Sequence, residues 1–242
     1  MSDAVRAGMD SLHDSVAEVA EKLDNVKPKL RGWLHLGTAP LTLAAGIVLI
    51  SLSPDTKTRI GSVVFIASAL VLFTVSAIYH TGTWSPRVWA FLRRFDHANI
   101  FILIAGTYTP FSLLLLEGTA QLVLLTTVWT GAILGVLFRI FWTDAPRWLY
   151  VPIYIALGWA AIFFVPAFFE GATALGLGIG IAVFVLIFAG GALYTVGSVV
   201  YGFKRPNPSP RWFGFHEVFH SFTILAFVSH YVGISMATYA LR

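Results

Sequence analysis

Three histidines and one carboxylate carry the chemistry that this sequence can offer. His216 and His220 are four residues apart, so on a helix their imidazoles share one face, about 6 Å apart along the axis. His80 and Asp96 lie in or beside other apolar segments of the chain. Two imidazoles at this spacing and a third from another segment are typical ligands of catalytic zinc, which keeps its fourth position open. The chain has no cysteine, so thiolate metal sites are excluded.

A zinc ion in such a site would support hydrolysis. It lowers the pKa of a bound water to about 7, which makes hydroxide available at neutral pH. Asp96 could accept a proton from that water or hold a ligand imidazole. Ser76, four residues before His80 and on the same helix face, is a candidate partner of that water. Back-bonding of Ser76 to its own helix explains its position equally well.

The elements that must position these residues are membrane helices. The 242 residues are 57% hydrophobic and 12% charged, whereas soluble domains are nearer one quarter charged. A bilayer core needs about 20 apolar residues per helix. Seven stretches qualify and predict an all-α, seven-transmembrane bundle: 33–52, 60–81, 97–116, 120–141, 148–168, 173–199 and 215–238. The basic residues are scattered among the loops, which argues against nucleic-acid binding.

The distribution of Lys and Arg predicts the orientation of this bundle. Thirteen of the 16 basic residues fall on the side of the N-terminus, against Lys57, Arg59 and Arg242 on the other side. The positive-inside rule therefore places the N-terminus in the cytoplasm and the C-terminus outside. The same threading brings His80, Asp96 and the histidine pair of the seventh stretch into one layer at the cytoplasmic side.

The remaining histidines of the spans are expected to lie outside the metal site. His97 follows Asp96 but is turned about 100° away on a helix, which favours packing. His230 lies ten residues after His220, about 15 Å farther along the helix, and is interpreted as structural or pore-facing. His35 is expected at the membrane interface. The glycines of the sixth stretch are interpreted as positions of close packing between helices rather than as a dimer face.

Residues 1–32 form a separate cytoplasmic segment before the seven-span domain of residues 33–242. Apolar residues spaced by three and four predict an amphipathic helix with an acidic opposite face, which disfavours binding to anionic lipid. We expect this helix to pack under the bundle or on a partner chain, and self-association through the stripe is possible. The stripe consists of Val5, Met9, Leu12, Val16, Val19, Leu23 and Val26.

Residues 216–220 also read H-E-x-x-H, the signature of zinc metalloproteases, in which the glutamate is the general base. Intramembrane proteases of this type need a distal aspartate in an Asp-Gly setting, and the chain has no Asp-Gly dipeptide. The protease interpretation is therefore a minor one, and Glu217 is interpreted as an accidental match.

The motifs together resemble the haemolysin III family, which is grouped with the progestin and adipoQ receptors and the alkaline ceramidases. Residues 29–35 (KLRGWLH) and 106–110 (GTYTP) are similar to its bacterial branch, and the resemblance covers essentially the whole spanning region. The motifs that carry it are Ser76-x3-His80, Asp96 before the third span, and His216-x3-His220.

This resemblance implies zinc held by His80, His216 and His220, with Asp96 contacting the zinc-bound water and Ser76 nearby. The family pattern leaves the position of Glu217 free, which further disfavours a protease.

Three functions follow as hypotheses. The leading one is a zinc-dependent hydrolase of a lipid amide or ester, with membrane lipid as substrate, in the cell membrane of a bacterium. The second is a non-enzymatic lipid sensor or a cytolytic haemolysin in which zinc is structural. The third is the intramembrane protease.

Overall fold

The computed structural model describes residues 28–242 and confirms an all-α architecture with seven helical spans. Most of the amphipathic N-terminal segment, residues 1–27, lies outside the described residues. The elements are α2 (Trp33–Ser51), α3 (Thr56–Thr81), α4 (Pro86–Leu115), α5 (Gly118–Phe141), α6 (Arg147–Gly158), η1 (Ala160–Phe164), α7 (Val165–Thr173), α8 (Leu177–Phe203) and α9 (Phe215–Ala240).

The third span begins eleven residues earlier than the apolar stretch predicted, at Pro86 instead of residue 97. Proline suits the first position of a helix because its φ is preset and the missing N–H has no partner there. The added turns carry Arg87, Arg93 and Arg94, which a hydropathy criterion excludes from a span although they form a regular helix. This extension places Asp96 inside α4 and not at its start.

The fifth span is interrupted, which the sequence did not indicate. α6 ends at Gly158, a short 3-10 segment follows, and α7 resumes at Val165 with Pro166 in its first turn. Proline is well tolerated there because an N–H in the first turn has no carbonyl of an earlier turn to donate to, so its absence costs nothing. The sixth span is also displaced, running over Leu177–Phe203 instead of 173–199, because the chain turns at Gly176 with a φ of 103°.

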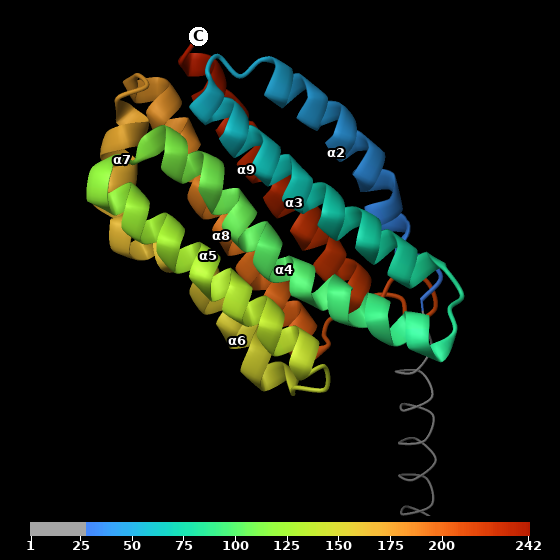
Figure 1. Ribbon diagram of the computed structural model, residues 1–242. Coiled ribbons are helices and arrows are strands. Elements are labelled where there is room, and N and C mark those ends of the chain that lie inside the picture. Colours follow the sequence, from blue (N-terminus) through green and yellow to red (C-terminus); the bar gives the residue numbers. More distant parts are fainter. Residues whose placement is uncertain (1–27) are drawn as a thin grey trace, which may run out of the picture.

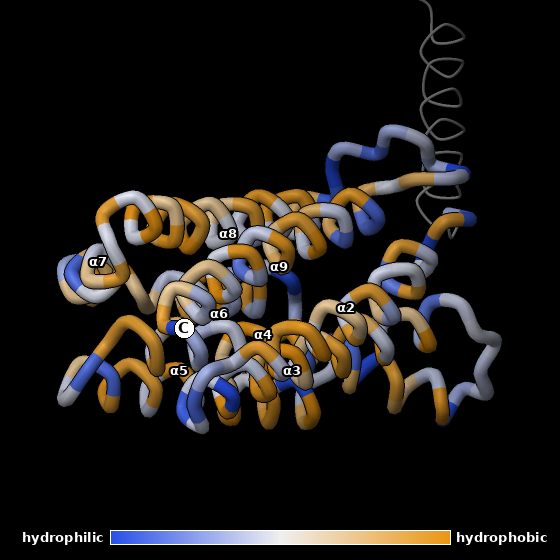
Figure 2. The backbone as a smooth tube through the Cα atoms, turned by 90° about the horizontal axis from the view of Figure 1, so that it is seen from above, coloured by the Kyte–Doolittle hydropathy of each residue, from blue (hydrophilic) through white to orange (hydrophobic). Residues whose placement is uncertain are grey.

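The helices form an up-and-down bundle in which neighbours in sequence pack side by side (Figure 1). α9 runs behind α3 and α4 in this view and packs along α8, whereas α2 lies at the edge against α3 and α9. Apolar residues predominate along the helices (Figure 2), and many large apolar side chains are exposed on the bundle, as expected of helices that face lipid. Gly190 and Gly197 of α8 contact α9, so the packing interpretation of these glycines is confirmed.

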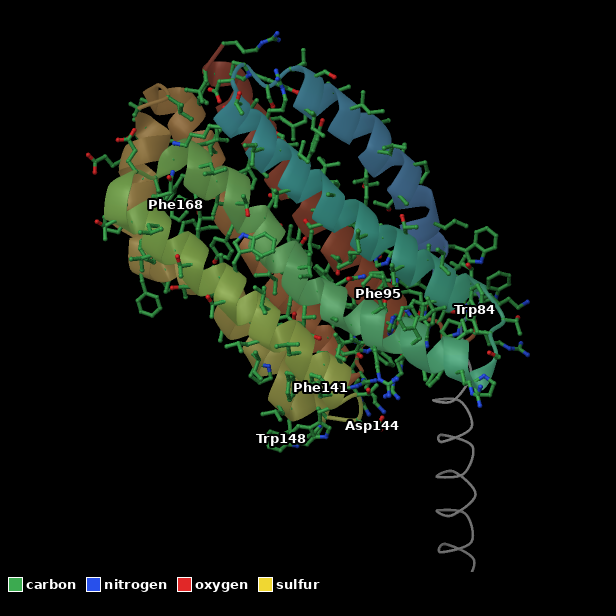
Figure 3. All side chains as sticks on the ribbon, viewed as in Figure 1. Trp84, Phe95, Phe141, Asp144, Trp148 and Phe168 are labelled. Carbon is green, nitrogen blue, oxygen red and sulfur yellow. The ribbon has the colours of Figure 1, made fainter. Side chains whose placement is uncertain are left out.

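Exposed tryptophans gather at the end of the bundle where α2, α4, α6 and α9 begin. Figure 3 shows two of them, Trp84 and Trp148, at this end together with Asp144, whereas Phe168 lies toward the opposite end. Tryptophan is enriched where a membrane meets water. This end therefore lies at a membrane interface. The exposed set is Trp33, Trp84, Trp89, Trp142, Trp148 and Trp212.

Candidate metal centre

Three buried histidines meet at this tryptophan-rich end of the bundle. His80 occupies the last turn of α3, and His216 and His220 occupy the first two turns of α9. Their nearest ring nitrogens all lie within 4.8 Å of one another. The structure thus brings together the three residues that the sequence predicted as ligands.

The donor set fits a zinc ion. Tetrahedral zinc with imidazole bonds of about 2.0–2.1 Å places two ligand nitrogens about 3.3 Å apart. The Nε2 atoms of His216 and His80 are 3.2 Å apart. In addition, Nδ1 of His220 is buried and has no hydrogen-bond partner among the described residues. A cation would satisfy this lone pair, because a buried polar atom without a partner is costly.

Asp96 supplies a carboxylate beside the three imidazoles. Its Oδ2 atom lies 4.0 Å from Nε2 of His80, and its side chain is 12% exposed. Ser76, one turn before His80 on α3, is buried and is a hydrogen-bonding neighbour of the Asp96 carboxyl group. The two candidate catalytic residues therefore lie together at the edge of the histidine cluster, and the hydroxyl of Ser76 reaches beyond its own helix.

His35 is the residue that the sequence interpretation placed wrongly. It was expected at the interface, but it is 2% exposed, and its ring stacks on that of His220 with centroids 3.8 Å apart and planes 15° apart. Phe73 also packs edge-on against the His35 ring. Neither ring nitrogen of His35 has a hydrogen-bond partner among the described residues. His35 reaches His220 because α2 packs beside α9. The spacing of residues within one segment cannot predict a contact between two helices.

Glu217, the acid of the H-E-x-x-H match, is fully buried and held by two other groups. Its Oε1 accepts a hydrogen bond from Nε of Arg31 at 2.8 Å. Its Oε2 accepts from the backbone N–H of Gly214 at 2.8 Å, which satisfies one of the free donors at the start of α9. Both oxygens are engaged in holding the N-terminus of α9, which disfavours Glu217 as a general base.

The segment before α2, residues 28–32, packs against His80 and the loop before α9. Gly32 has a φ of 88°, and a Cβ atom there would lie 2.7 Å from Cβ of His80. Only glycine combines this left-handed backbone with such a close approach to His80. Backbone N–H groups of Lys29 and Leu30 donate to carbonyls of the loop before α9, at Arg211 and Trp212. This segment therefore contacts both His80 on α3 and the loop that leads to His216 and His220 on α9.

His97 lies next to the cluster but bonds elsewhere, consistent with its interpretation as a packing residue. Its Nδ1 donates to the backbone carbonyl of Arg93 at 2.8 Å, and its Nε2 accepts from the hydroxyl of Tyr201 at 3.2 Å. With Nδ1 as donor, the ring has its second nitrogen occupied by Tyr201. Nδ1 of His97 also lies 3.4 Å from Oδ2 of Asp96, so His97 and His80 both neighbour this carboxylate oxygen.

A cavity of about 130 Å³ leads from this centre into the bundle. One end of the cavity, called the metal end below, is lined by residues of the candidate centre: Ser76, Asp96, His216 and His220. Apolar side chains such as Phe168 form most of the remaining wall, and His230 also lines it. An apolar chamber that opens onto three imidazoles and a carboxylate could accommodate a molecule with a long apolar chain and a polar group at one end.

Comparison with known proteins finds a matching family model and matching relatives. The family model described as haemolysin-III related matches residues 23–231. A protein named hemolysin-3 homolog from Bacillus subtilis is 34% identical over 161 residues, which cover 66% of this chain and 69% of that protein. A protein named hemolysin-3 from Bacillus cereus is 34% identical over 170 residues, covering 69% of this chain and 74% of that protein. The match begins at residue 23, so residues 1–22 lie outside the shared region.

Proposed function

The chain belongs to the haemolysin III family, and we propose that it is a zinc-dependent membrane hydrolase that cleaves an amide or ester bond of a lipid. The observation that carries this proposal is the convergence of three buried imidazoles, a carboxylate and a hydroxyl at one end of an apolar cavity. A purely structural metal needs neither the carboxylate nor the cavity.

His80, His216 and His220 are the residues that would hold the metal. When bound, zinc polarises a carbonyl group and makes hydroxide available at neutral pH. Neutral imidazoles are the form that binds metal, and their burial among apolar helices favours that form. The stack of His35 on His220 and the hold of Glu217 on the start of α9 keep the ligand pair in place.

Asp96 is the proposed general base and acid. Its carboxylate is the acid group beside the cluster, and it would take the proton from the attacking water and return it to the leaving nitrogen or oxygen. Ser76 orients this carboxyl group through its hydroxyl. If its single O–H turned from Asp96 to the substrate, it would donate to the oxygen that becomes negative during attack on the carbonyl.

The substrate class follows from the shape and depth of the site. The metal end lies at the tryptophan-rich interface, where a lipid head group would lie, and the cavity leads from there toward the middle of the bundle. A substrate carbonyl at the metal and an acyl chain in the cavity would match both regions. The excess of basic residues on this side makes the cytoplasmic leaflet of the cell membrane the proposed source of substrate.

A second candidate function is lysis of membranes, or sensing of their state, with zinc as a structural link between α3 and α9. The names of the two Bacillus relatives, hemolysin-3 and hemolysin-3 homolog, favour it. In that case Asp96 would have no essential role, whereas loss of any of the three histidines would weaken the fold.

Hydrolysis by the purified protein separates these candidates. The full chain would be reconstituted with zinc into liposomes that contain a ceramide or a phospholipid, and released fatty acid would be measured by mass spectrometry. We expect release by the natural protein and none by His80→Ala. Release at equal rates by both proteins would overturn the hydrolase proposal, as would the absence of release from every lipid amide and ester tested.

A further inference from the structure

The cavity has a second group of buried polar atoms without partners, at the end opposite the metal centre. Nδ1 of His230 on α9 and the hydroxyl of Tyr194 on α8 have no hydrogen-bond partner among the described residues, and both residues line the cavity. The hydroxyls of Thr107 and Thr223, which also line it, are occupied by carbonyls of their own helices. Nδ1 of His220 belongs to a candidate metal ligand, whereas no ligand has been assigned to this distal pair.

The backbone of α8 makes room for His230. Its Nε2 donates to the backbone carbonyl of Ile187 at 3.1 Å, so Nδ1 carries no proton in this neutral ring and is an acceptor. A Cβ atom on Gly190 would lie 2.2 Å from Nε2, so any larger residue there would displace the imidazole. Phe111 packs edge-on against the ring at a centroid distance of 5.7 Å. The acceptor therefore has a defined position and direction.

Tyr194 supplies a complementary group. It follows Gly190 by four residues and thus lies on the same face of α8, with its ring centroid 5.8 Å from that of His230. A phenol both donates and accepts hydrogen bonds, whereas Nδ1 of His230 in this tautomer accepts only. A ligand hydroxyl, which donates once and accepts, satisfies both atoms together. A carbonyl or a carboxylate cannot donate to His230 and would leave it unpaired.

We propose that His230 and Tyr194 form a distal subsite that binds a hydroxyl group carried on the chain of a lipid in the cavity. His230 follows His220 by ten residues, so the subsite is about 15 Å from the metal end along α9. The ligand is thus an amphiphile with a polar head at the histidine cluster and a hydroxyl within its chain. The subsite shares the cavity with the proposed hydrolase centre, but binding there requires no hydrolysis.

Binding of paired ligands tests this proposal. The full-length protein in detergent would be titrated with octadecanoic acid and with hydroxyoctadecanoic acids whose hydroxyl is moved along the chain, by displacement of a fluorescent fatty acid. At the matching position we expect the hydroxy acid to bind about tenfold more tightly than the plain acid, as two added hydrogen bonds allow. The head group is constant, so this ratio keeps its meaning if the protein neither binds zinc nor hydrolyses lipid.

Two tyrosine variants form a matched pair. Tyr194→Phe removes one of the two hydrogen bonds and should lower the preference to about threefold, while leaving the affinity for octadecanoic acid unchanged. Tyr231→Phe is the control, because the hydroxyl of Tyr231 donates to the backbone carbonyl of Ala45 on α2, away from the cavity, and its loss should leave the preference intact. Equal affinity for every ligand in the natural protein would assign the two atoms to a structural water and overturn the proposal. An undiminished tenfold preference in Tyr194→Phe would also overturn it.

Discussion

Arg31 and Glu217 form an ion pair, with Nε of Arg31 2.8 Å from Oε1 of Glu217, beside the proposed metal ligand His216. Glu217 is fully buried, and its second oxygen accepts from the N–H of Gly214. The pair connects the segment before α2 to the start of α9. These contacts favour a structural function for the acidic residue of the H-E-x-x-H match over a catalytic one.

Two substitutions of Glu217 separate these functions. Glu217→Ala leaves Arg31 without its partner and should lower the free energy of unfolding by about 3 kcal/mol, as breaking a buried pair does. Glu217→Gln keeps an oxygen that can accept from Gly214 and should be destabilised less, with zinc content and lipid hydrolysis retained. Thermal melting in detergent and fatty-acid release are the measurements. Loss of hydrolysis in a folded, zinc-loaded Glu217→Gln protein would contradict this and would indicate that Glu217 is the general base, as in H-E-x-x-H metalloproteases.

His35 should act on the metal through its stack with His220. His35→Ala removes the surface that fixes the plane of the His220 ring, and we expect zinc affinity to fall about tenfold, as for loss of other groups that orient a ligand. His35→Phe keeps an aromatic face and is the matched variant, with affinity close to that of the natural protein. Competition against a zinc chelator measures both. Equal affinities in the natural protein and in His35→Ala would show that the stack has no part in binding.

Asp96→Asn tests the proposed base without removing a metal ligand. The amide keeps the size of the side chain and its contact with Ser76 but cannot accept the proton of an attacking water. We expect bound zinc to be unchanged and the rate of lipid hydrolysis to fall at least about a hundredfold. A rate within a factor of two of the natural one would show that Asp96 is not the base and would favour the structural role of zinc.

The predicted orientation can be tested with single cysteines, because the chain contains none. Pro208 lies exposed in the loop before α9, and Arg242 is exposed at the other end of that helix. In intact cells, a membrane-impermeant maleimide should label Arg242→Cys but not Pro208→Cys, and cell lysis should make Pro208→Cys reactive. Ser62→Cys, which is buried inside the bundle, is the unreactive control. The reverse pattern would place the metal centre at the outer leaflet.

The spans and the histidine layer could be predicted because their causes are local. Long apolar runs must be helical in a bilayer, and a spacing of four places His216 and His220 on one helix face. The asymmetric distribution of Lys and Arg then predicted that His80 and Asp96 lie at the same membrane depth as this pair. That prediction used no contact between helices. The structure brings these four residues together.

Features that depend on contacts between helices could not be predicted in this way. The stack of His35 on His220 requires α2 to lie against α9, and nothing in the sequence around His35 distinguishes this from an interfacial position. The break after Gly158 and the extension of α4 to Pro86 could not be predicted from hydropathy either. Hydropathy reports which residues suit lipid, and not where a helix begins or changes its hydrogen-bond pattern.

The zinc centre itself can be measured directly by X-ray absorption at the zinc edge on the purified full-length protein. We expect one zinc per chain, with three imidazole nitrogens at about 2.0–2.1 Å and a further light-atom ligand. In His216→Ala the zinc content should fall and the remaining spectrum should lose imidazole scattering. Protein that contains no zinc after loading, or a zinc spectrum that is identical in His216→Ala, would contradict the assignment of His80, His216 and His220 as its ligands.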